Sequence, residues 1–479
     1  MRATEILVLI GSYYFGYKSC KEMYKPSAQI ILEVVAMRLE ELRLKLNAIS
    51  VYRTILEDKL LKSLQLFLER IFSEKIDLNC FVSRYNSIYF DLVSMKQQVS
   101  LREYIIDLII TDENPFSWAA ERTEYESINI MLVKAASNDL RNLEEISKVS
   151  SDIFKEYALQ YLCTSSYEAT VVNSLPDWNN GQPEGHTSTL KELFYENDIW
   201  NRYIRELSDF YKTNGTGIFS RYRAFKWEKE GEFGSLKGID TPDPVMLSDF
   251  IGYETERSEI INNTEQFLKG YSANNMLLYG DRGTGKSSTV KALVNEYWKK
   301  GLRIVEVPKN NLADFPKIIA QLKDRKQKFI IFIDDLAFED EEESYTSLKA
   351  VLEGGLQSRP LNVVIYATSN RRHLIKEKFS DRLGLQSGNA DDEIRSQDTI
   401  QEKLSLADRF GITIVFSSPD KNRFLEIVEG IAAKRGICYD RDKLVREALK
   451  WEMWYNGRSP RTARQFIDWL EGNTSVVCR

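Results

Sequence analysis

The chain has 479 residues, 43% of them hydrophobic and 28% charged, which suits about two to four soluble domains. The formal net charge of −6 excludes a strongly basic, general nucleic-acid binder, although a local basic patch is still allowed. Five scattered cysteines without a Cys-x-x-Cys pair, and only two histidines, argue against a zinc site and a disulfide scaffold and favour a cytoplasmic protein.

The N-terminal half reads as helical. The apolar run at residues 6–10 is too short to span a membrane and lacks the features of a secretory signal, so we expect a buried helix or strand there and no membrane partner. Amphipathic spacing of three and four residues then predicts helices that pack into an intramolecular bundle. The apolar positions are Val35, Leu39, Leu42, Leu46 and Ile49, followed by Leu60, Leu64, Phe67 and Ile71.

Two segments break this pattern. Residues 174–190 are rich in Asn, Gly and Pro and read as a loop. Residues 231–244 contain Pro242 and Pro244, which stop regular structure. We therefore predict a mainly helical N-terminal domain over 1–230, of unknown function, and a linker over 231–244.

Short apolar runs alternate with helical stretches after residue 245. They lie at 276–279, 304–307, 329–333, 363–367 and 412–416. Such alternation predicts an α/β fold with a parallel sheet built from βαβ units. From Asp420 onward the pattern is helical only, so we expect an α/β core over 245–418 and a small helical lid over 419–479.

A phosphate-binding motif follows the first of these runs. Residues 280–288 fit the pattern G-x-x-x-x-G-K-[ST] at every fixed position, between a predicted strand and a predicted helix. Glycines let backbone N–H groups turn toward phosphates, and the helix N-terminus adds a positive dipole end. We expect Lys286 to reach the β- and γ-phosphates of ATP and the Ser287 hydroxyl to bind Mg²⁺. The segment is Gly280, Asp281, Arg282, Gly283, Thr284, Gly285, Lys286, Ser287 and Ser288.

Polar residues end two later strands. Asp334 and Asp335 follow the apolar run 329–333, and a bound Mg²⁺ would explain two carboxylates beside a buried strand. We predict that Asp334 binds the metal and that Asp335 polarises the attacking water. Asn370 ends the next run and is either a contact to the γ-phosphate or its water, or a turn residue. The acidic run 339–343 reads as a solvated loop.

The order of phosphate loop, paired acidic residues, strand-end Asn, late Arg and helical lid resembles AAA+ ATPases over residues 240–479. Within them, residues 332–335 are similar to the replication-initiator and helicase-loader group. Residues 277–288 and 366–374 resemble a bacterial group of AAA+ ATP-binding proteins of unknown function. This resemblance implies an AAA+ module behind a helical N-terminal domain.

Further residues follow from the resemblance. Ile251 and Tyr253 match the segment that lines the adenine pocket, or else form a helix-leading turn. Arg409 matches the Arg that reaches a neighbouring subunit's γ-phosphate, with Arg382 as the alternative, and either could be an ordinary surface residue. Arg461 matches the lid Arg that contacts nucleotide, with Arg458 and Arg464 as possible substitutes. Ser459 suits the cap of its helix and Pro460 the first turn, and His373 reads as structural.

Several functions are compatible with these residues. An oligomeric ATPase that remodels or loads a macromolecular partner is favoured by Arg409, which implies a homo-oligomer with an unknown protein partner. A slow nucleotide-dependent switch or scaffold is favoured by Asp335, because many AAA+ proteins have Glu there. A DNA-associated initiator or loader is supported by the paired Asp residues alone, and the acidic balance opposes it. A small-molecule kinase is disfavoured by the paired acids, Asn370 and the lid.

Overall fold

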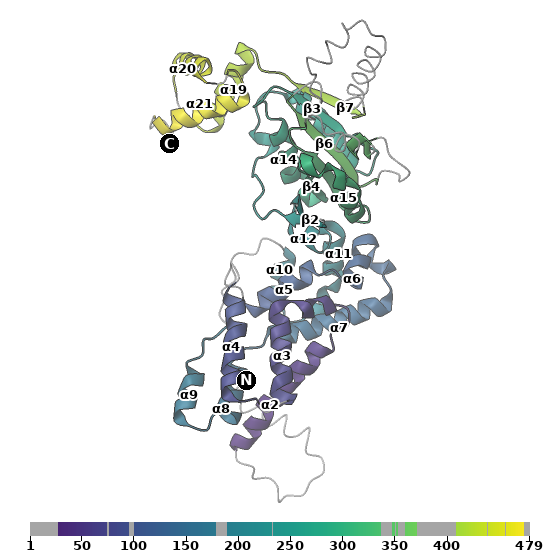
Figure 1. The fold of residues 1–479 in the computed structure, drawn as a ribbon, viewed down its shortest axis with the longest axis vertical. Coiled ribbons are helices and arrows are strands. Elements are labelled where there is room, and N and C mark those ends of the chain that lie inside the picture. The colour runs from purple at the N-terminus through teal and green to yellow at the C-terminus, as the bar shows by residue number, and fades with distance from the viewer. Residues whose placement is uncertain are drawn as a thin grey trace, which may run out of the picture. The chain divides into compact units, whose positions relative to one another are not determined.

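The computed structural model describes residues 27–73, 76–94, 100–178, 189–231, 233–336, 347–349, 351–352, 360–370, 409–437, 439–455 and 457–473. The chain divides into two compact units (Figure 1). One unit runs to Ser208, and the other starts at Asp209 and also includes Ala120–Thr123. Each unit is described separately below.

The first unit is helical, and its helices bury the apolar positions that the sequence spacing predicts. Leu39, Leu46, Leu60, Leu64 and Phe67 are each at most 2% exposed, as amphipathic packing requires. The helices are α2 (Ser27–Asn47), α3 (Lys59–Ser73), α4 (Leu78–Val93), α5 (Leu101–Thr111), α6 (Pro115–Arg122), α7 (Ile130–Ser147), α8 (Ser151–Tyr161), α9 (Ser166–Asn173), α10 (Thr189–Glu196) and α11 (Ile204–Asn214), of which α6 and α11 continue into the second unit.

The second unit is built on a seven-stranded sheet of order β2-β1-β4-β5-β6-β3-β7. Its strands are β1 (Ala224–Glu230), β2 (Phe233–Gly238), β3 (Met276–Gly280), β4 (Leu302–Glu306), β5 (Lys328–Ile333), β6 (Val363–Ser369) and β7 (Ile412–Phe416). Strand β2 pairs antiparallel with β1, and all other pairs are parallel. The parallel sheet predicted for the C-terminal half is confirmed.

The first two strands correct the expected linker over 231–244. Strand β1 pairs with β4, so residues 224–230 belong to the sheet and not to the helical domain. Strand β2 occupies residues 233–238 inside the predicted linker. The physical reason is cross-strand pairing: Trp227 is fully buried, although its neighbours in sequence are charged. Pro242 and Pro244 do lie outside helices and strands, as predicted.

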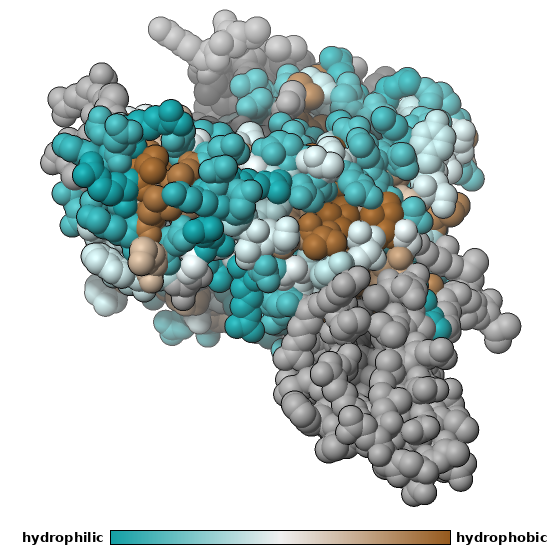
Figure 2. Space-filling model, turned by 90° about the horizontal axis from the view of Figure 1, so that it is seen from above, coloured by the Kyte–Doolittle hydropathy of each residue, from teal (hydrophilic) through white to brown (hydrophobic). Residues whose placement is uncertain are grey.

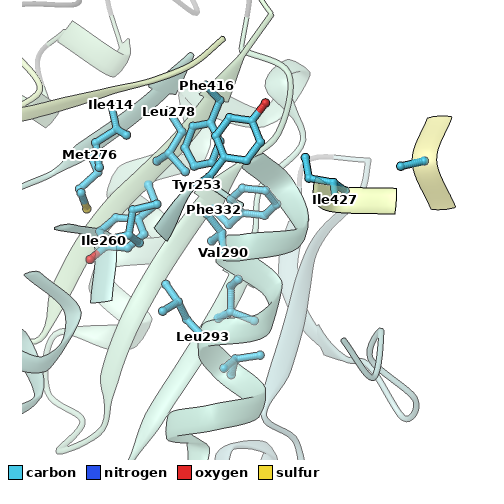
Figure 3. Close-up of a cluster of buried hydrophobic side chains, with 14 of the residues drawn as sticks. Tyr253, Ile260, Met276, Leu278, Val290, Leu293, Phe332, Ile414, Phe416 and Ile427 are labelled. Atoms are coloured by element: carbon cyan, nitrogen blue, oxygen red, sulfur yellow. The ribbon is translucent and has the colours of Figure 1, made fainter. Parts of the chain in front are cut away.

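Helices cover both faces of the sheet, which explains the uninterrupted apolar run of β5. Ile330 and Phe332 join one buried cluster with α13 (Glu254–Leu268) and α14 (Lys286–Tyr297). Figure 3 shows the part of this cluster around Val290, Leu293 and Phe332. Phe329, Ile331 and Ile333 join a second cluster with α15 (Phe315–Leu322).

Three helices after β7 form the lid: α19 (Lys421–Lys434), α20 (Arg441–Trp454) and α21 (Pro460–Asn473). Four apolar side chains are buried between these helices and the rest of the second unit: Phe424, Ile427, Phe466 and Ile467. Ser459 accepts a hydrogen bond from the Thr462 N–H at 3.1 Å, which confirms it as the cap of α21.

On the face drawn in Figure 2, hydrophilic side chains dominate and apolar ones gather in small patches.

The remaining short elements connect these helices and strands. They are α12 (Ile218–Arg221) and the 3₁₀ helices Arg53–Glu57, Tyr125–Ser127, Trp200–Tyr203, Leu247–Asp249, Trp298–Lys300 and Lys309–Asp314. No helix in the described part of the chain combines the length and the hydropathy needed to cross a membrane.

Candidate functional site

A cleft of ≈ 440 Å³ opens at the carboxyl ends of the central strands of the second unit. The loop between β3 and α14 forms its floor, and the residues that follow β5 and β6 form one wall. Residues 249–257 and the lid helices α19 and α21 form the rest. Crevices at the carboxyl ends of parallel strands are the usual ligand sites of such sheets.

The loop from Gly280 to Gly285 has the backbone that the glycine spacing predicts. Gly283 and Gly285 have φ values of +79° and +96°, which side chains with a Cβ rarely adopt. Helix α14 begins at Lys286, so its N–H groups and its positive dipole end face the cleft. The loop can therefore accept an anionic group without rearrangement of its φ angles.

Lys286 is 5% exposed and lines the cleft. Its ammonium donates hydrogen bonds to the carbonyl oxygens of Gly280 at 2.9 Å and Asp281 at 2.7 Å, and to Asn370 Oδ1 at 3.2 Å. Burial lowers the pKa of Lys286 below its ordinary value, and the carboxylates around it oppose that shift. A bound phosphate would place negative charge next to this ammonium and so offset the cost of burying its positive charge.

The Asp334 carboxylate accepts hydrogen bonds from two hydroxyl groups. Ser287 Oγ donates to Asp334 Oδ1 at 2.5 Å, and Thr368 Oγ1 donates to the same oxygen at 2.6 Å. Thr368 also accepts the Asp335 N–H at 3.0 Å. Thr368 lines the cleft and was not among the predicted site residues. Sequence spacing does not mark Thr368, because only the register of β5 and β6, which pairs Ile333 with Ala367, sets Asp334 beside it.

Asp335 and Asn370 form the next pair. Asn370 Nδ2 donates to Asp335 Oδ1 at 2.7 Å, while the other amide atom accepts from Lys286. The Asn370 amide therefore connects the acid and the ammonium, a use of both its donor and its acceptor. Asp335 has φ +51°, a left-handed conformation that a non-glycine residue adopts only where its surroundings hold it.

The opposite end of the cleft is apolar. Phe250, Ile251 and Tyr253 come from the segment before α13, and Ile427 and Ile431 come from the lid helix α19. The two elements are in close contact, since a Cβ on Gly430 would lie 2.6 Å from Ile251 Cδ1. Such an apolar end next to a polar one suits a ligand with a ring at one end and charge at the other.

Arg461 and Arg464 line the cleft from the start of α21. The backbone N–H of Arg461 donates to the Gly283 carbonyl at 3.1 Å, which joins the lid to the loop between β3 and α14. Arg458, the other substitute considered, instead donates to Glu452 at 2.7 Å. Arg257 lines the cleft as well, with its guanidinium 5.2 Å above the Phe250 ring. Its position could not be predicted, because the residue looks like part of an ordinary amphipathic helix.

Several predicted residues lie elsewhere. Gly280 and Asp281 do not line the cleft, and the Asp281 carboxylate faces the segment after β7 instead. Arg409 does not line the cleft of its own chain. Arg382, His373 and the acidic run 339–343 fall outside the described residues.

A magnesium ion fits the donor set. Mg²⁺ prefers hard oxygen ligands, and proteins supply it with one or two side chains while phosphates and water complete the shell. Ser287 and Asp334 provide two such oxygens at the mouth of the loop. The described residues contain no group of three or more His, Cys, Asp or Glu side chains that could hold a metal ion.

The strand–loop–helix motif, the paired acids and the Asn at neighbouring strand ends, and the helical lid together define an AAA+ P-loop module. The family described as "Protein of unknown function (DUF815)" matches residues 220–474, more than half of the chain. The chain belongs to this family. The match begins just before β1, in agreement with the place of β1 and β2 in the sheet.

Known proteins resemble parts of the chain. A putative 26S proteasome regulatory subunit homolog of Methanocaldococcus jannaschii is 24% identical over 303 residues, which is 55% of this chain and 76% of that protein. The replication factor C large subunit of Staphylothermus marinus is 40% identical over 73 residues, 15% of this chain and 16% of that one. A solved structure of a RuvB mutant from Thermotoga maritima has a TM-score of 0.32 at 16% identity, covering 49% of this chain and 68% of that one.

Proposed function

We propose that this AAA+ protein binds Mg-ATP in the cleft and hydrolyses it, and that hydrolysis drives the remodelling or loading of a macromolecular partner. The observation that carries the proposal is the connected set of side chains on the cleft wall. Lys286, Asn370 and Asp335 follow one another by hydrogen bonds, and Ser287 and Asp334 lie beside them.

Each residue has a chemical task in this proposal. Lys286 neutralises phosphate charge, and the N–H groups at the start of α14 hold the phosphate oxygens. Asp335 accepts a proton from the attacking water, and Asn370 orients its carboxylate. Ser287 and Asp334 hold Mg²⁺, which when bound would neutralise charge on the phosphates. The apolar end with Ile251, Tyr253 and Ile427 takes the adenine ring, and Arg461 contacts the phosphates from the lid.

Two observations support the partner side of the proposal. Two relatives bear names of subunits of larger assemblies, a proteasome regulatory subunit homolog and a replication factor C subunit. Arg409 lies outside the cleft of its own chain, which is compatible with action on a neighbouring subunit's nucleotide in a homo-oligomer. The helical N-terminal unit would then hold the partner.

The test is ATP hydrolysis per chain over a dilution series. We expect specific activity to rise with protein concentration, to be lost in Lys286→Ala at all concentrations, and to lose its concentration dependence in Arg409→Ala. Lys291→Ala is the matched control, because Lys291 lies on α14 and does not line the cleft. Activity that is independent of concentration and unaffected by Arg409→Ala would contradict the shared site.

A second candidate is a slow nucleotide-dependent switch. The observation that favours it is the pairing of Asp335 with Asn370, which occupies one oxygen of the proposed base. Negligible hydrolysis together with nucleotide binding that depends on Lys286 would select this function. A DNA-associated loader is the third candidate, and it predicts DNA binding that weakens steeply with salt.

A further inference from the structure

A connector of four residues, 417–420, joins strand β7 to the first lid helix α19. The lid therefore depends on this connector for its orientation relative to the sheet. Two residues, Tyr253 from the segment before α13 and Asp281 from the loop after β3, make hydrogen bonds to it.

Tyr253 reaches the connector from the apolar end. Its hydroxyl donates to the Ser417 carbonyl at 2.6 Å, and its ring stacks on Phe416 with the centroids 5.4 Å apart. The guanidinium of Arg423, in the first turn of α19, lies 4.4 Å from the centroid of the Tyr253 ring. Tyr253 is fully buried and has φ +59°, so packing holds it in a conformation that a tyrosine rarely adopts.

Asp281 reaches the connector from the start of the loop between β3 and α14. Its Oδ2 accepts the Ser418 N–H at 2.9 Å, and its own N–H donates to the Phe416 carbonyl at 3.1 Å. The hydrogen bonds from Ser418 lower the pKa of the Asp281 carboxyl, so it is ionised at neutral pH. Gly280 lies against the same strand end, because a Cβ there would be 2.1 Å from the Phe416 carbonyl oxygen.

Lys286 links this contact to the ligand. An ammonium group has three N–H donors. The Lys286 ammonium already donates to Gly280, Asp281 and Asn370 within 3.2 Å, and Thr284 Oγ1 is a longer contact at 3.5 Å. A phosphate oxygen that binds Lys286 must therefore share or replace one of these acceptors. Two of the three closer acceptors are the carbonyl oxygens of Gly280 and Asp281, whose backbone is hydrogen-bonded to the end of β7. Phosphate binding therefore alters the contacts that hold the connector.

We propose that Tyr253 and Asp281 are positioning residues that transmit the contents of the nucleotide cleft to the lid through residues 417–420. This inference rests on the proposed function, because it assumes that the cleft binds a nucleotide. It assigns to Asp281 a role that differs from the phosphate binding expected from its place in the motif. It also gives the Tyr253 hydroxyl a task that the aromatic ring alone cannot perform.

The experiment is hydrogen exchange of the full chain, read by mass spectrometry on peptides that cover residues 414–425. Wild type, Tyr253→Phe and Asp281→Ala are compared without nucleotide, with Mg-ADP and with a non-hydrolysable ATP analogue. Tyr366→Phe is the control for the first variant, since Tyr366 is also fully buried and its hydroxyl bonds to Asn263 and Thr264. Asp440→Ala is the control for the second, since its carboxylate accepts the Lys443 N–H at 3.0 Å.

We expect connector amides to exchange about threefold to tenfold faster in both variants without nucleotide, because a hydrogen bond to the connector or its neighbour is lost. The difference between nucleotide states should disappear, while the Kd of a fluorescent ADP changes by less than about threefold, because the ring of Tyr253 and the loop backbone remain. In hydrolysis, kcat should fall and KM should change little. Both controls should keep the nucleotide-dependent change.

Three results would overturn the inference. Connector exchange in the two variants could equal that of the controls. Wild type could bind nucleotide without any change in connector exchange, which would leave the proposed function intact. Wild type could instead bind no nucleotide, which would refute the proposed function and the transmission together.

Discussion

Replacement of Thr368 by Val tests the arrangement of the acidic wall. Thr368 is 2% exposed, donates to Asp334 at 2.6 Å and accepts the Asp335 N–H at 3.0 Å. Valine has nearly the same shape and suits strand β6, so packing is preserved while both hydrogen bonds are lost. Asp334 would keep only the Ser287 hydroxyl among these two donors, and Asp335 would lose the contact that supports its left-handed backbone.

The magnitude follows from the two hydrogen bonds. A bond to a charged acceptor contributes about 1.5–3 kcal/mol when shielded, but Asp334 and Asp335 are both exposed, and water recovers part of the loss. We therefore expect Thr368→Val to lower the free energy of unfolding of the second unit by about 1–2 kcal/mol. If half of that loss appears at the transition state, kcat for ATP hydrolysis falls by about twofold to fivefold.

The assay pairs urea unfolding with steady-state ATP hydrolysis over a Mg²⁺ series. Thr264→Val is the matched control, because Thr264 is fully buried and bonds to the Ile260 carbonyl and to Tyr366 away from the cleft. Both variants should lose stability, and only Thr368→Val should lose activity and need more Mg²⁺. Equal activity in the two variants would refute the role of Thr368 in holding Asp334 and Asp335.

Three further predictions follow from single residues. Asp335→Asn should change the free energy of unfolding by less than about 0.5 kcal/mol, because Asn tolerates the left-handed φ of +51°. The same substitution should slow single-turnover hydrolysis by about a hundredfold or more. Normal turnover would exclude Asp335 as the base. Gly283→Ala places a Cβ 3.0 Å from Ser459 Oγ, whereas Gly270→Ala, at a similar φ, meets nothing within 4 Å. Both should lose about 1–2 kcal/mol of stability to backbone strain, but Gly283→Ala alone should weaken nucleotide affinity, by about tenfold, and equal Kd values would refute the lid contact. Burial raises the pKa of Tyr253 from 10.0 to about 12, so the folded state holds this proton more tightly, and the resulting stability is present below pH 10 and lost as the pH rises through about 12. Between these values Tyr253→Phe should reduce the fall in unfolding free energy by about 1.4 kcal/mol per pH unit, and an unchanged slope in urea unfolding would contradict the shift.

Local patterns in the sequence predicted the elements that local physics controls. Glycine spacing predicted the loop, because only glycine readily adopts the φ values of +79° and +96° found at Gly283 and Gly285. The unbroken apolar run ending at Ile333 predicted a strand with helices on both faces, and β5 is buried on both. The cap at Ser459 and the apolar spacing after Asp420 predicted the lid helices.

Tertiary structure alone decided which of these elements meet. Thr368 became part of the site because the register of β5 and β6 sets it beside Asp334, 34 residues away. The Asp281 carboxylate faces away from the cleft because Ser418, 137 residues away, donates two hydrogen bonds to it. Residues 224–230, expected in the helical domain, and 233–238, expected in the linker, are strands of the sheet instead, because pairing with β4 and burial of Trp227 outweigh the charged local sequence.

The sequence by itself therefore determined a P-loop α/β module of AAA+ type, the loop that can take phosphates and the lid behind it. The tertiary structure decided which acid each hydroxyl serves, which residues line the apolar end, and what holds the lid to the sheet. The physical reason is range: φ preference, helix capping and apolar spacing act over a few residues and can be read in order. Hydrogen bonds between strand ends form only after the sheet has set its register.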